Sequence, residues 1–482
     1  MEFELEQILG IQRAAHWVDG PASVEVRRDR LERLACVVVQ HSDEIVDALS
    51  RDFGGRSCHT TRIGDVIGAV NAIRFNRDKL EDWMQPEPIE LPSPVTQTGL
   101  RAELRYQPLG VIGAIVPWNG PVLMGILAAA GALAAGNRLM LKVPELTPLS
   151  SALMSRMFAQ AFKPEEAHVI EGDAIVAAAF SRLPFDHLLF TGSTATGRQV
   201  ARAASENLVP VTLELGGRNP LIVGNGADIE TTAARIVTGK MASAGQVCVS
   251  PDYVLVPRAT LSSLREAMAR HAAQLYPRLL GNDDYTSIIS ERHFERLCHL
   301  LDDAREQGAE VLAINPSQED LWPNQERKFP LCILTGVRPE MKVMQEETFG
   351  PLLSLLPYDS LDEALSIIAD QPASLSGYYF GSDEVECERV VAQMATGNMV
   401  INDVRCQLFY EQLPFGGLGS SGMGRYRGHA GFKTFSNAKT IVYQTNDDTA
   451  LARQRPPFPE AARAGVLAQI ETLKKEFQFP TP

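Results

Sequence analysis

Residues 111–145 read VIGAIVPWNGPVLMGILAAAGALAAGNRLMLKVPE. In this stretch a segment of helical pattern lies between two short apolar segments. Val111–Val116 and Leu139–Val143 have the length and the continuously apolar character of strands that are buried on both faces. Residues 122–135 between them predict a buried helix. The further predicted strands are His168–Glu171, His187–Phe190 and Val209–Leu213, and the further predicted helices are 148–162, 173–182 and 197–207. This alternation predicts an α/β fold, with a parallel sheet covered by helices on both faces.

The segments around this region have other patterns. Residues 4–85 are helical in pattern, 86–94 form a proline-rich connection, and Thr96–Pro108 alternates like an exposed pair of strands. Phe432–Tyr443 predicts a strand that pairs with this region, and the tail ends in an amphipathic helix around 459–476. A second α/β stretch runs from about 217 to 424, with helices expected near 228–244, 260–275, 291–307, 361–370 and 383–395. The 482 residues therefore predict several structural units.

Composition excludes some classes of protein. The net charge of −14 argues against binding to nucleic acid or to an anionic membrane surface. Seven cysteines without a dense framework, and an acidic N-terminus, predict a cytoplasmic protein with no signal peptide. Residues 109–136 are uncharged, but Pro117, Asn119 and Pro121 interrupt them, so we expect no membrane span.

Three residues have the pattern of catalytic groups. Cys248 follows the small residues 242–245, which allow a tight turn that aims the sulfur into a pocket, although most cysteines are core residues. Glu214 ends an apolar strand and precedes two glycines; a half-buried carboxylate there is a candidate general base, the alternative being a cap for the next turn. Asn119 also follows a strand and can donate to a developing oxyanion or satisfy loop backbone.

Two other strand ends have features of a nucleotide site. FTGSTATG at 190–197 joins a strand to a helix, and its glycines and helix N-terminus suit a phosphate. Lys142 and Glu145 follow a second strand, where Glu145 can accept from ribose hydroxyls or form an exposed ion pair with Lys142. GLGSSG at 417–422 matches the usual dinucleotide fingerprint, but no strand leads into it and no βαβ unit follows. We therefore interpret it as a loop packed near the active site.

Other chemistries lack their signals. The pairs Cys58-His59 and Cys298-His299 fit no ligand spacing, so no metal site is predicted. No G-x-S-x-G elbow is present, which argues against a serine hydrolase.

The order of the motifs resembles the aldehyde dehydrogenase superfamily over roughly residues 20–445. The series is PWN at 117–119, KVPE at 142–145, FTGSTATG at 190–197, ELGG at 214–217, GQVC at 245–248, EETFGP at 346–351 and PFGGLGSSGMG at 414–424. Among the departures, Gly120 stands where the family usually has Phe, Arg218 replaces a usual Lys, and Arg427 stands where one branch often has His. None of these departures affects Cys248, Glu214 or Asn119, so they leave the identity of the substrate open but not the type of reaction.

The resemblance implies a role for each matching residue. Cys248 is the nucleophile, Asn119 and the Cys248 backbone N–H form the oxyanion hole, and Glu214 activates water. The residues it assigns to an NAD site, with NADP as the alternative, are Trp118, Lys142, Glu145, Gly192, Ser193, Gly197, Glu347 and Phe349. An aldehyde is thus expected to become a carboxylic acid through a Cys248 thioester. The rivals are a CoA-acylating relative, a thiol esterase and a non-catalytic structural protein.

The resemblance also implies the domains. We expect a Rossmann-like cofactor domain (1–83 and 106–216), a catalytic domain (217–430) and a tail (445–482). A small β arm (84–105 and 431–444) implies a homodimer. The phrases IND at 401–403 and GFKTFS at 431–436 resemble the class-3 branch. PVTLE at 210–214 and CVSPDYVLVP at 248–257 are similar to the coniferyl aldehyde dehydrogenase group of that branch, which implies a bulky or aromatic aldehyde.

Overall fold

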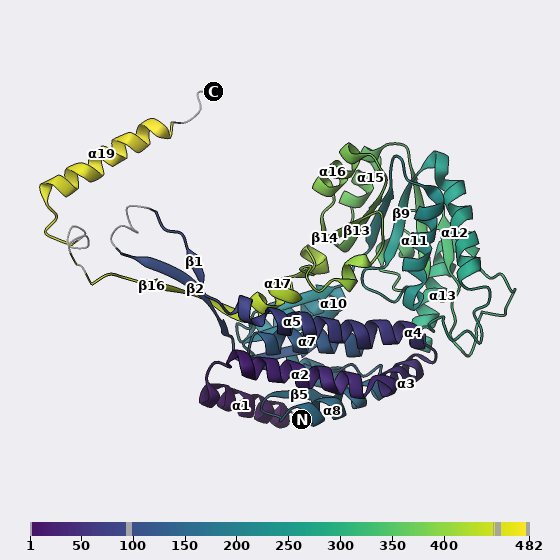
Figure 1. Cartoon of the computed structure of the whole chain (residues 1–482). Coiled ribbons are helices and arrows are strands. Elements are labelled where there is room, and N and C mark those ends of the chain that lie inside the picture. Colours follow the sequence, from purple (N-terminus) through teal and green to yellow (C-terminus); the bar gives the residue numbers. More distant parts are fainter. Residues whose placement is uncertain (1, 93–98, 447, 449–454, 479–482) are drawn as a thin grey trace. The chain divides into compact units, whose positions relative to one another are not determined.

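A computed structural model of the chain describes residues 2–92, 99–446, 448 and 455–478 (Figure 1). By the contacts between its residues the chain forms two compact units. The larger unit comprises Met1–Trp83 and Gln107–Asn437, and the smaller comprises Met84–Tyr106 and Ala438–Pro482. The larger unit contains two sheets, whereas the separation of a cofactor domain from a catalytic domain stays a prediction.

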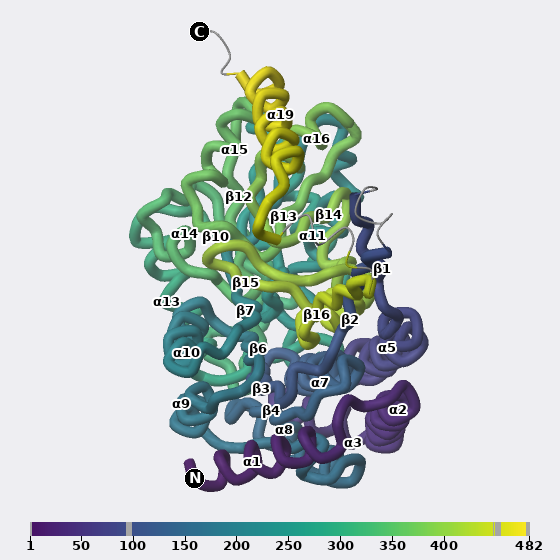
Figure 2. Tube along the Cα trace, turned by 90° about the vertical axis from the view of Figure 1, so that its left-hand side faces the viewer, coloured from purple at the N-terminus to yellow at the C-terminus, as the bar shows by residue number. Residues whose placement is uncertain are grey.

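The first sheet of the larger unit has six strands in the order β15-β7-β6-β3-β4-β5. Its strands are β3 (Val111–Ile115), β4 (Arg138–Lys142), β5 (Ala167–Ile170), β6 (His187–Gly192), β7 (Val211–Leu215) and the antiparallel β15 (Gly422–Met423). The other neighbours are parallel, and Figure 2 shows β7, β6, β3 and β4 following one another. The predicted α/β sheet is confirmed.

This sheet positions the candidate site through its strand order. The chain first adds β4 and β5 on one side of β3, then returns to add β6 and β7 on the other. Such a reversal leaves a crevice at the carboxyl ends of the strands, where ligands bind in open α/β sheets. The connecting helices are α7 (Pro121–Ala134), α8 (Pro148–Ala161), α9 (Ala174–Ser181) and α10 (Thr194–Ser205). The last helix begins three residues earlier than predicted, because Ser193 caps it by accepting from the backbone N–H of Thr196.

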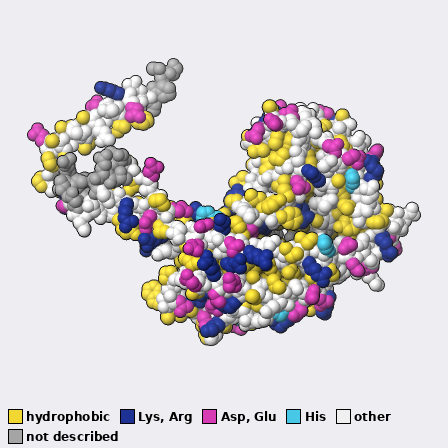
Figure 3. Space-filling view, viewed as in Figure 1, with side chains coloured by type: hydrophobic (Ala, Val, Ile, Leu, Met, Phe, Trp, Pro, Cys, Tyr) yellow, Lys and Arg dark blue, Asp and Glu magenta, His cyan; other side chains and the backbone are white. Residues whose placement is uncertain are grey.

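The helical N-terminal region is confirmed, with one irregular turn. The helices are α1 (Glu2–Asp19), α2 (Val24–Gln40), α3 (Ser42–Phe53), α4 (Cys58–Thr61) and α5 (Ala69–Trp83). A π-helical segment, η1 (Arg62–Gly68), joins α4 to α5 and contains the buried Asp65. Acidic and basic side chains intermingle over these helices on the face shown in Figure 3.

The second sheet of the larger unit has seven strands in the order β10-β11-β12-β9-β8-β13-β14. The strands are β8 (Asn219–Val223), β9 (Pro251–Pro257), β10 (Glu310–Ala313), β11 (Cys332–Thr335), β12 (Leu352–Tyr358), β13 (Ser374–Phe380) and β14 (Thr396–Ile401). Only the β10–β11 pair is antiparallel. The helices predicted for this stretch are present as α11 (Ile229–Met241), α12 (Leu261–Leu275), α13 (Glu291–Glu306), α15 (Leu361–Ala369) and α16 (Glu384–Gln393).

Alternate residues of the central strands pack on opposite faces of this sheet. Leu221 and Val254 belong to a cluster with α11, α12 and α13. Ile222 and Leu255 belong to a second cluster with α15 and α16. Figure 1 shows the two helix layers on either side of β9 and β13. Since both faces are covered, the central strands are mainly apolar.

The smaller unit contains a three-stranded sheet in the order β1-β2-β16. Its strands are β1 (Glu87–Ile89), β2 (Arg101–Pro108) and β16 (Ser436–Tyr443), and α19 (Glu460–Glu476) follows. The predicted pairing of the last strand with the 96–108 region is confirmed at β2. The prediction of an irregular connection at 86–94 was wrong in part, because β1 lies within it. Residues 93–98, which include the start of the predicted strand pair, lie outside the described residues.

The prediction of a strand from Phe432 was also wrong. Gly428–Thr434 forms a helix, α17, and the strand begins only at Ser436. The rings of Phe432 and Phe435 are fully buried; Phe432 lies 5.5 Å from Trp83 between ring centroids, and Phe435 packs against His187. Packing of these rings therefore overrides the strand-like pattern.

Candidate active site

One large cavity of about 1780 Å³ opens along the carboxyl ends of β3, β4, β6 and β7. All but one of the residues predicted for the site line it: Trp118, Asn119, Lys142, Glu145, Gly192, Ser193, Glu214, Cys248, Glu347 and Phe349. The exception is Gly197, which is buried inside α10. A Cβ there would overlap the side chain of Leu215, so Gly197 permits helix–strand packing.

Cys248 lies on a loop whose backbone is tightly constrained. The preceding residues Ser243, Ala244 and Gly245 all have positive φ, between 50° and 73°. A Cβ on Gly245 would overlap the backbone carbonyl of Gly350, so glycine is required for both conformation and space. The loop before the cysteine is thus packed directly against the EETFGP segment.

Gln246 and Asn219 hold this loop from the two sides of the cysteine. The Gln246 amide donates to the backbone carbonyls of Ser243 and Ser287 and accepts from the N–H of Ile289. The Asn219 side chain donates to the carbonyl of Cys248 at 2.8 Å. The cysteine backbone is therefore fixed before any ligand binds.

The Cys248 thiol is half-buried and lies near two acids. Burial raises its pKa to about 12, and the charges of Glu347 and Glu214 act in the same direction. Arg427 opposes them only in part. At neutral pH the ligand-free protein therefore holds Cys248 as a thiol.

Glu214 is the most unusual acid in the cavity. Its side chain ends β7 and is 2% exposed, and neither carboxylate oxygen has a hydrogen-bond partner among the described residues. Burial raises its pKa well above the ordinary value, while Arg427 and Arg425 pull it down. An unsatisfied buried carboxyl of this kind is unfavourable for stability and is typical of a catalytic acid or base.

Asn119 is presented by the loop that follows β3. Its amide nitrogen donates to the carbonyl of Gln246 at 3.1 Å, and its backbone carbonyl accepts from Arg56. Arg56 is in turn paired with the buried Asp65 at 2.7 Å. The side-chain amide is thus held next to the cysteine loop.

Lys142 and Glu145 lie at the end of β4. The Lys142 ammonium donates to the carbonyl of Val143 at 2.5 Å, and burial lowers its pKa. Glu145 is exposed, with 4.0 Å between the two charged groups. One buried donor and one exposed carboxylate at a strand end suit the hydroxyls of a ribose.

Glu347 lies against the backbone of the ELGG segment. A Cβ on Gly216 would overlap its carboxylate, so the two residues approach as closely as a glycine allows. Burial raises the pKa of Glu347 to about 8, and the charge of Asp252 adds to this effect. Phe349, at a φ of 43°, places its ring 5.4 Å from that of Trp118.

Several residues of the cavity wall were not predicted from the sequence. Arg405, Phe409, Tyr410 and Glu411 line it, and all come from the connection between β14 and α17. No motif marks them, and only a charge next to the IND phrase was available as a signal. Arg427 was noted only as a departure from the family, yet its charge reaches both Cys248 and Glu214.

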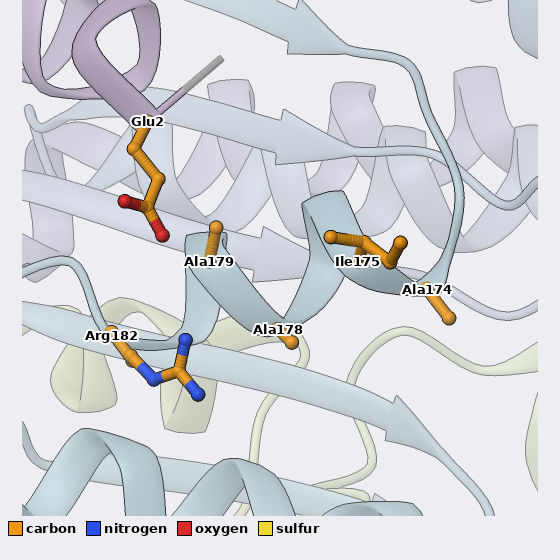
Figure 4. A pocket seen from close by; sticks show the side chains of 6 residues that line it. All are labelled: Glu2, Ala174, Ile175, Ala178, Ala179 and Arg182. Carbon is orange, nitrogen blue, oxygen red and sulfur yellow. The ribbon is translucent and has the colours of Figure 1, made fainter.

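A smaller pocket of about 580 Å³ adjoins the large cavity and shares Ala174, Ala178 and Arg182 with it; Figure 4 shows Glu2 projecting towards it from α1. Within the described ranges, no three His, Cys, Asp or Glu side chains are grouped so as to hold a metal ion. The described helices also include none that is long and apolar enough to cross a bilayer.

The model of the aldehyde dehydrogenase family matches residues 12–441. The chain belongs to this family. It is 42% identical to a probable coniferyl aldehyde dehydrogenase of Caulobacter vibrioides over 97% of each chain, and 43% identical to the coniferyl aldehyde dehydrogenase of Pseudomonas sp. strain HR199 over 95% of this chain and 94% of that one. It is 32% identical to a mouse dimeric NADP-preferring aldehyde dehydrogenase over 90% and 94%.

Solved aldehyde dehydrogenase structures have the same fold. A substrate-bound AldH of Staphylococcus aureus superposes with a TM-score of 0.89 at 32% identity, covering 97% of this chain and 99% of that one. Betaine aldehyde dehydrogenase of the same organism, in complex with NAD+, gives 0.82 at 25% identity over 92% and 88%. The chain itself is therefore an enzyme that oxidises aldehydes with NAD(P).

Proposed function

We propose that the chain oxidises a bulky or aromatic aldehyde, of the coniferyl aldehyde type, to the carboxylic acid through a thioester on Cys248. The observation that carries the reaction is the convergence of Cys248, Asn119 and the buried, unpaired Glu214 on one cavity. The substrate class is supported by the names of the relatives and by Gly120 and the aromatic side chains that line the cavity.

The first half of the reaction uses the cysteine and the two donors beside it. The Cys248 thiol first releases its proton to solvent. The thiolate then attacks the carbonyl carbon, and its sulfur forms a bond while the carbonyl oxygen becomes an oxyanion. The Asn119 amide and the Cys248 backbone N–H donate to that oxygen, each worth about 3 kcal/mol in the transition state. NAD(P), when bound, supplies the acceptor for the hydride that leaves this carbon.

The second half of the reaction is hydrolysis. Glu214 removes a proton from water, the water oxygen attacks the thioester carbon, and the Cys248 sulfur leaves. The raised pKa of Glu214 brings the carboxyl closer to the range in which a general base works at neutral pH. Retention of this base favours hydrolysis over transfer of the acyl group to CoA.

The cofactor is proposed to lie along the strand ends. Lys142 and Glu145 bind the adenosine ribose, Gly192 and Ser193 at the N-terminus of α10 bind the pyrophosphate, and Glu347 binds the nicotinamide ribose. Trp118 and Phe349 pack beside the nicotinamide. Glu145 would repel a 2′-phosphate, so we propose that NAD is preferred over NADP. Glu145→Gln should raise kcat/KM for NADP relative to NAD; an unchanged ratio would contradict this role.

Gly120 supports a wide substrate pocket. It lines the cavity, and a Cβ there would meet only the Met124 side chain, at 3.6 Å. Space for a large side chain is therefore left to the substrate. Aromatic side chains of Phe75, Phe409 and Tyr410 also line the cavity.

The test is a panel of aldehydes read by NADH absorbance, with Gly120→Phe as the matched variant. The wild type should have a higher kcat/KM for coniferyl aldehyde than for acetaldehyde. Gly120→Phe should lower the first value and leave the second nearly unchanged. A wild-type kcat/KM that is highest for a two- or three-carbon aldehyde would reject the proposed substrate class. NADH formation that requires CoA would reject the hydrolytic step.

Assembly and location are proposed on separate grounds. The mouse relative is named as dimeric, and β16 exposes Val442 in the small sheet, so we propose a homodimer through that sheet. Light scattering should give twice the chain mass, and a monomer would refute the proposed homodimer.

The seven free cysteines support a cytoplasmic location, which cell fractionation tests.

A further inference from the structure

Arg405 begins the short helical turn Cys406–Phe409 on the connection between β14 and α17. Its backbone has the left-handed conformation, with φ 65°. Gln407 anchors the turn, because its amide donates to the Ser376 hydroxyl at 3.1 Å. A non-glycine residue held at positive φ on an anchored turn has a defined side-chain direction, and the Arg405 side chain lines the large cavity.

The guanidinium of Arg405 has no partner of its own among the described residues. Its Nε atom is buried without a hydrogen bond, and none of its nitrogens is in an ion pair. Burial lowers its pKa, and the nearby Tyr378 and Cys248 counteract this when ionised. Arg405 as a whole is half-buried, and a partly desolvated cation without a counter-charge is stabilised by a ligand that supplies one.

Three other arginines that line the cavity without being exposed have partners: Arg296, for example, donates to the carbonyl of Glu347 at 3.2 Å. Arg56 is neutralised by Asp65 at 2.7 Å. Arg427 donates to the carbonyl of Leu408 and lies 4.6 Å from the ring centroid of Phe415. Among the described residues, Arg405 is therefore the half-buried arginine of the cavity lining that has no partner, whereas Arg182 and Arg198 line the cavity as exposed side chains.

We infer that Arg405 determines specificity by binding an anionic oxygen that the aldehyde substrate carries in addition to its aldehyde group. The guanidinium forks two N–H donors towards such an oxygen or towards both oxygens of a carboxylate. The wall beside it is formed by Leu408, Phe409 and Tyr410, which suits a ring between the two polar ends of the substrate. The inference rests on the proposed function and narrows it to aromatic aldehydes with a carboxylate or an ionised phenol.

The experiment compares three aldehydes of similar size: 4-carboxybenzaldehyde, 4-hydroxybenzaldehyde and 4-methylbenzaldehyde. In the wild type we expect kcat/KM to be highest for a compound with an acidic oxygen. Arg405→Leu should lower kcat/KM for that compound by about tenfold or more, because a charge-assisted hydrogen bond is lost, and change the value for the methyl compound by less than about twofold. Whichever acidic compound loses activity identifies a carboxylate or a phenol as the ligand.

Two variants control for charge and for folding. Arg405→Lys keeps the cation and should retain more of the preference than Arg405→Leu. Arg305→Leu removes an exposed arginine of α13 and should change no ratio. Calorimetric binding of terephthalate and 4-methylbenzoate to the full chain adds a readout without turnover. Only terephthalate should bind more weakly to Arg405→Leu, also by about tenfold.

Each result decides the inference. Equal losses for all three aldehydes would place Arg405 in the reaction or the fold and overturn the inference, as would unchanged ratios and unchanged terephthalate binding. If one of these contradicting results occurs while aromatic aldehydes are still preferred over acetaldehyde, the role of Arg405 is rejected and the proposed function remains. If acetaldehyde is the better substrate, the proposed function fails independently of Arg405.

Discussion

The side-chain amide of Asn119 donates a hydrogen bond of 3.1 Å to the backbone carbonyl of Gln246, two residues before Cys248. This bond joins the loop after β3 of the six-stranded sheet to the loop that precedes β9 of the seven-stranded sheet. The amide is therefore held beside the cysteine by a contact that a ligand does not have to create. Pre-positioned donors of this kind stabilise a developing oxyanion without reorganisation.

Replacing Asn119 with Ala should reduce kcat by about 10²–10³, because one oxyanion donor is lost. The thermal unfolding temperature should change little, since the amide is half-buried and makes one bond. Steady-state kinetics and a melting curve measure the two effects. A kcat within threefold of the wild type would assign the oxyanion to other donors.

Cys248→Ala should abolish dehydrogenase activity while NAD still binds, as measured by calorimetry. Cys58 is exposed and Cys298 and Cys387 are half-buried, and none of the three lines the cavity. Serine at each of these positions should leave activity largely intact. Turnover of more than a few per cent in Cys248→Ala would assign the chemistry elsewhere.

Gly245→Ala tests the geometry of the cysteine loop. The added Cβ would meet the carbonyl of Gly350, and the backbone would be strained at φ 73°. We expect a loss of activity together with faster proteolysis at the loop. Gly10→Ala is the matched control, because nothing lies within 4 Å of its Cβ position. Full activity in Gly245→Ala would show that the loop can relax.

The sequence predicted those parts of the fold and site that depend on local pattern. The buried strands of residues 111–215 and the helices of the second half have strong periodicity, so their positions agree with the structure to within a few residues. The local pattern predicted a strand at Phe432 and Phe435. It could not show that these rings pack against Trp83 and His187, which are distant in the sequence.

The residues that line the cavity could also be predicted only where a local motif marks them. Cys248 and Glu214 stand in recognisable phrases, whereas Arg405 lies in a connection with no motif. Its significance depends on its having no counter-charge nearby among the described residues, and that is a property of the folded chain. Gly197 has a packing role that its phrase did not indicate: it belongs to the segment predicted to bind a phosphate, and its lack of a side chain makes room for Leu215.

The raised pKa of Cys248, about 12, predicts how its reactivity depends on pH. Below that pKa the thiolate fraction grows about tenfold for each pH unit, so alkylation by iodoacetamide should accelerate steadily without a plateau near neutrality. Cys248→Ala supplies the background from the other cysteines. A plateau below pH ~8 would show that the thiolate is already formed in the ligand-free protein.

Glu347→Gln should speed this alkylation, but only where Glu347 is ionised. Its negative charge raises the pKa of Cys248, and its own pKa is about 8. The difference between variant and wild type should therefore appear as the pH rises above about 8. A difference of the same size at pH ~6 would indicate a structural effect of the substitution.

Glu214→Gln tests the hydrolytic half of the reaction directly. Formation of the thioester needs Cys248, the oxyanion donors and NAD, whereas its hydrolysis needs water made nucleophilic by a base. Glutamine has the shape of glutamate but no proton-accepting charge, and it replaces a buried carboxyl that has no hydrogen bond to lose among the described residues. The variant should therefore fold and still form about one NADH per active site in a rapid burst, followed by slow turnover.

The burst and its product can be followed separately. Rapid mixing measures the amplitude of NADH formation, and mass spectrometry should find the acyl group on the peptide that contains Cys248. Glu214→Asp is the conservative control, because it keeps the carboxylate and should recover part of the steady rate. Unchanged steady turnover in Glu214→Gln would mean that another group activates water. Loss of the burst would mean that Glu214 already acts before hydrolysis, as the base that deprotonates the half-buried Cys248 thiol.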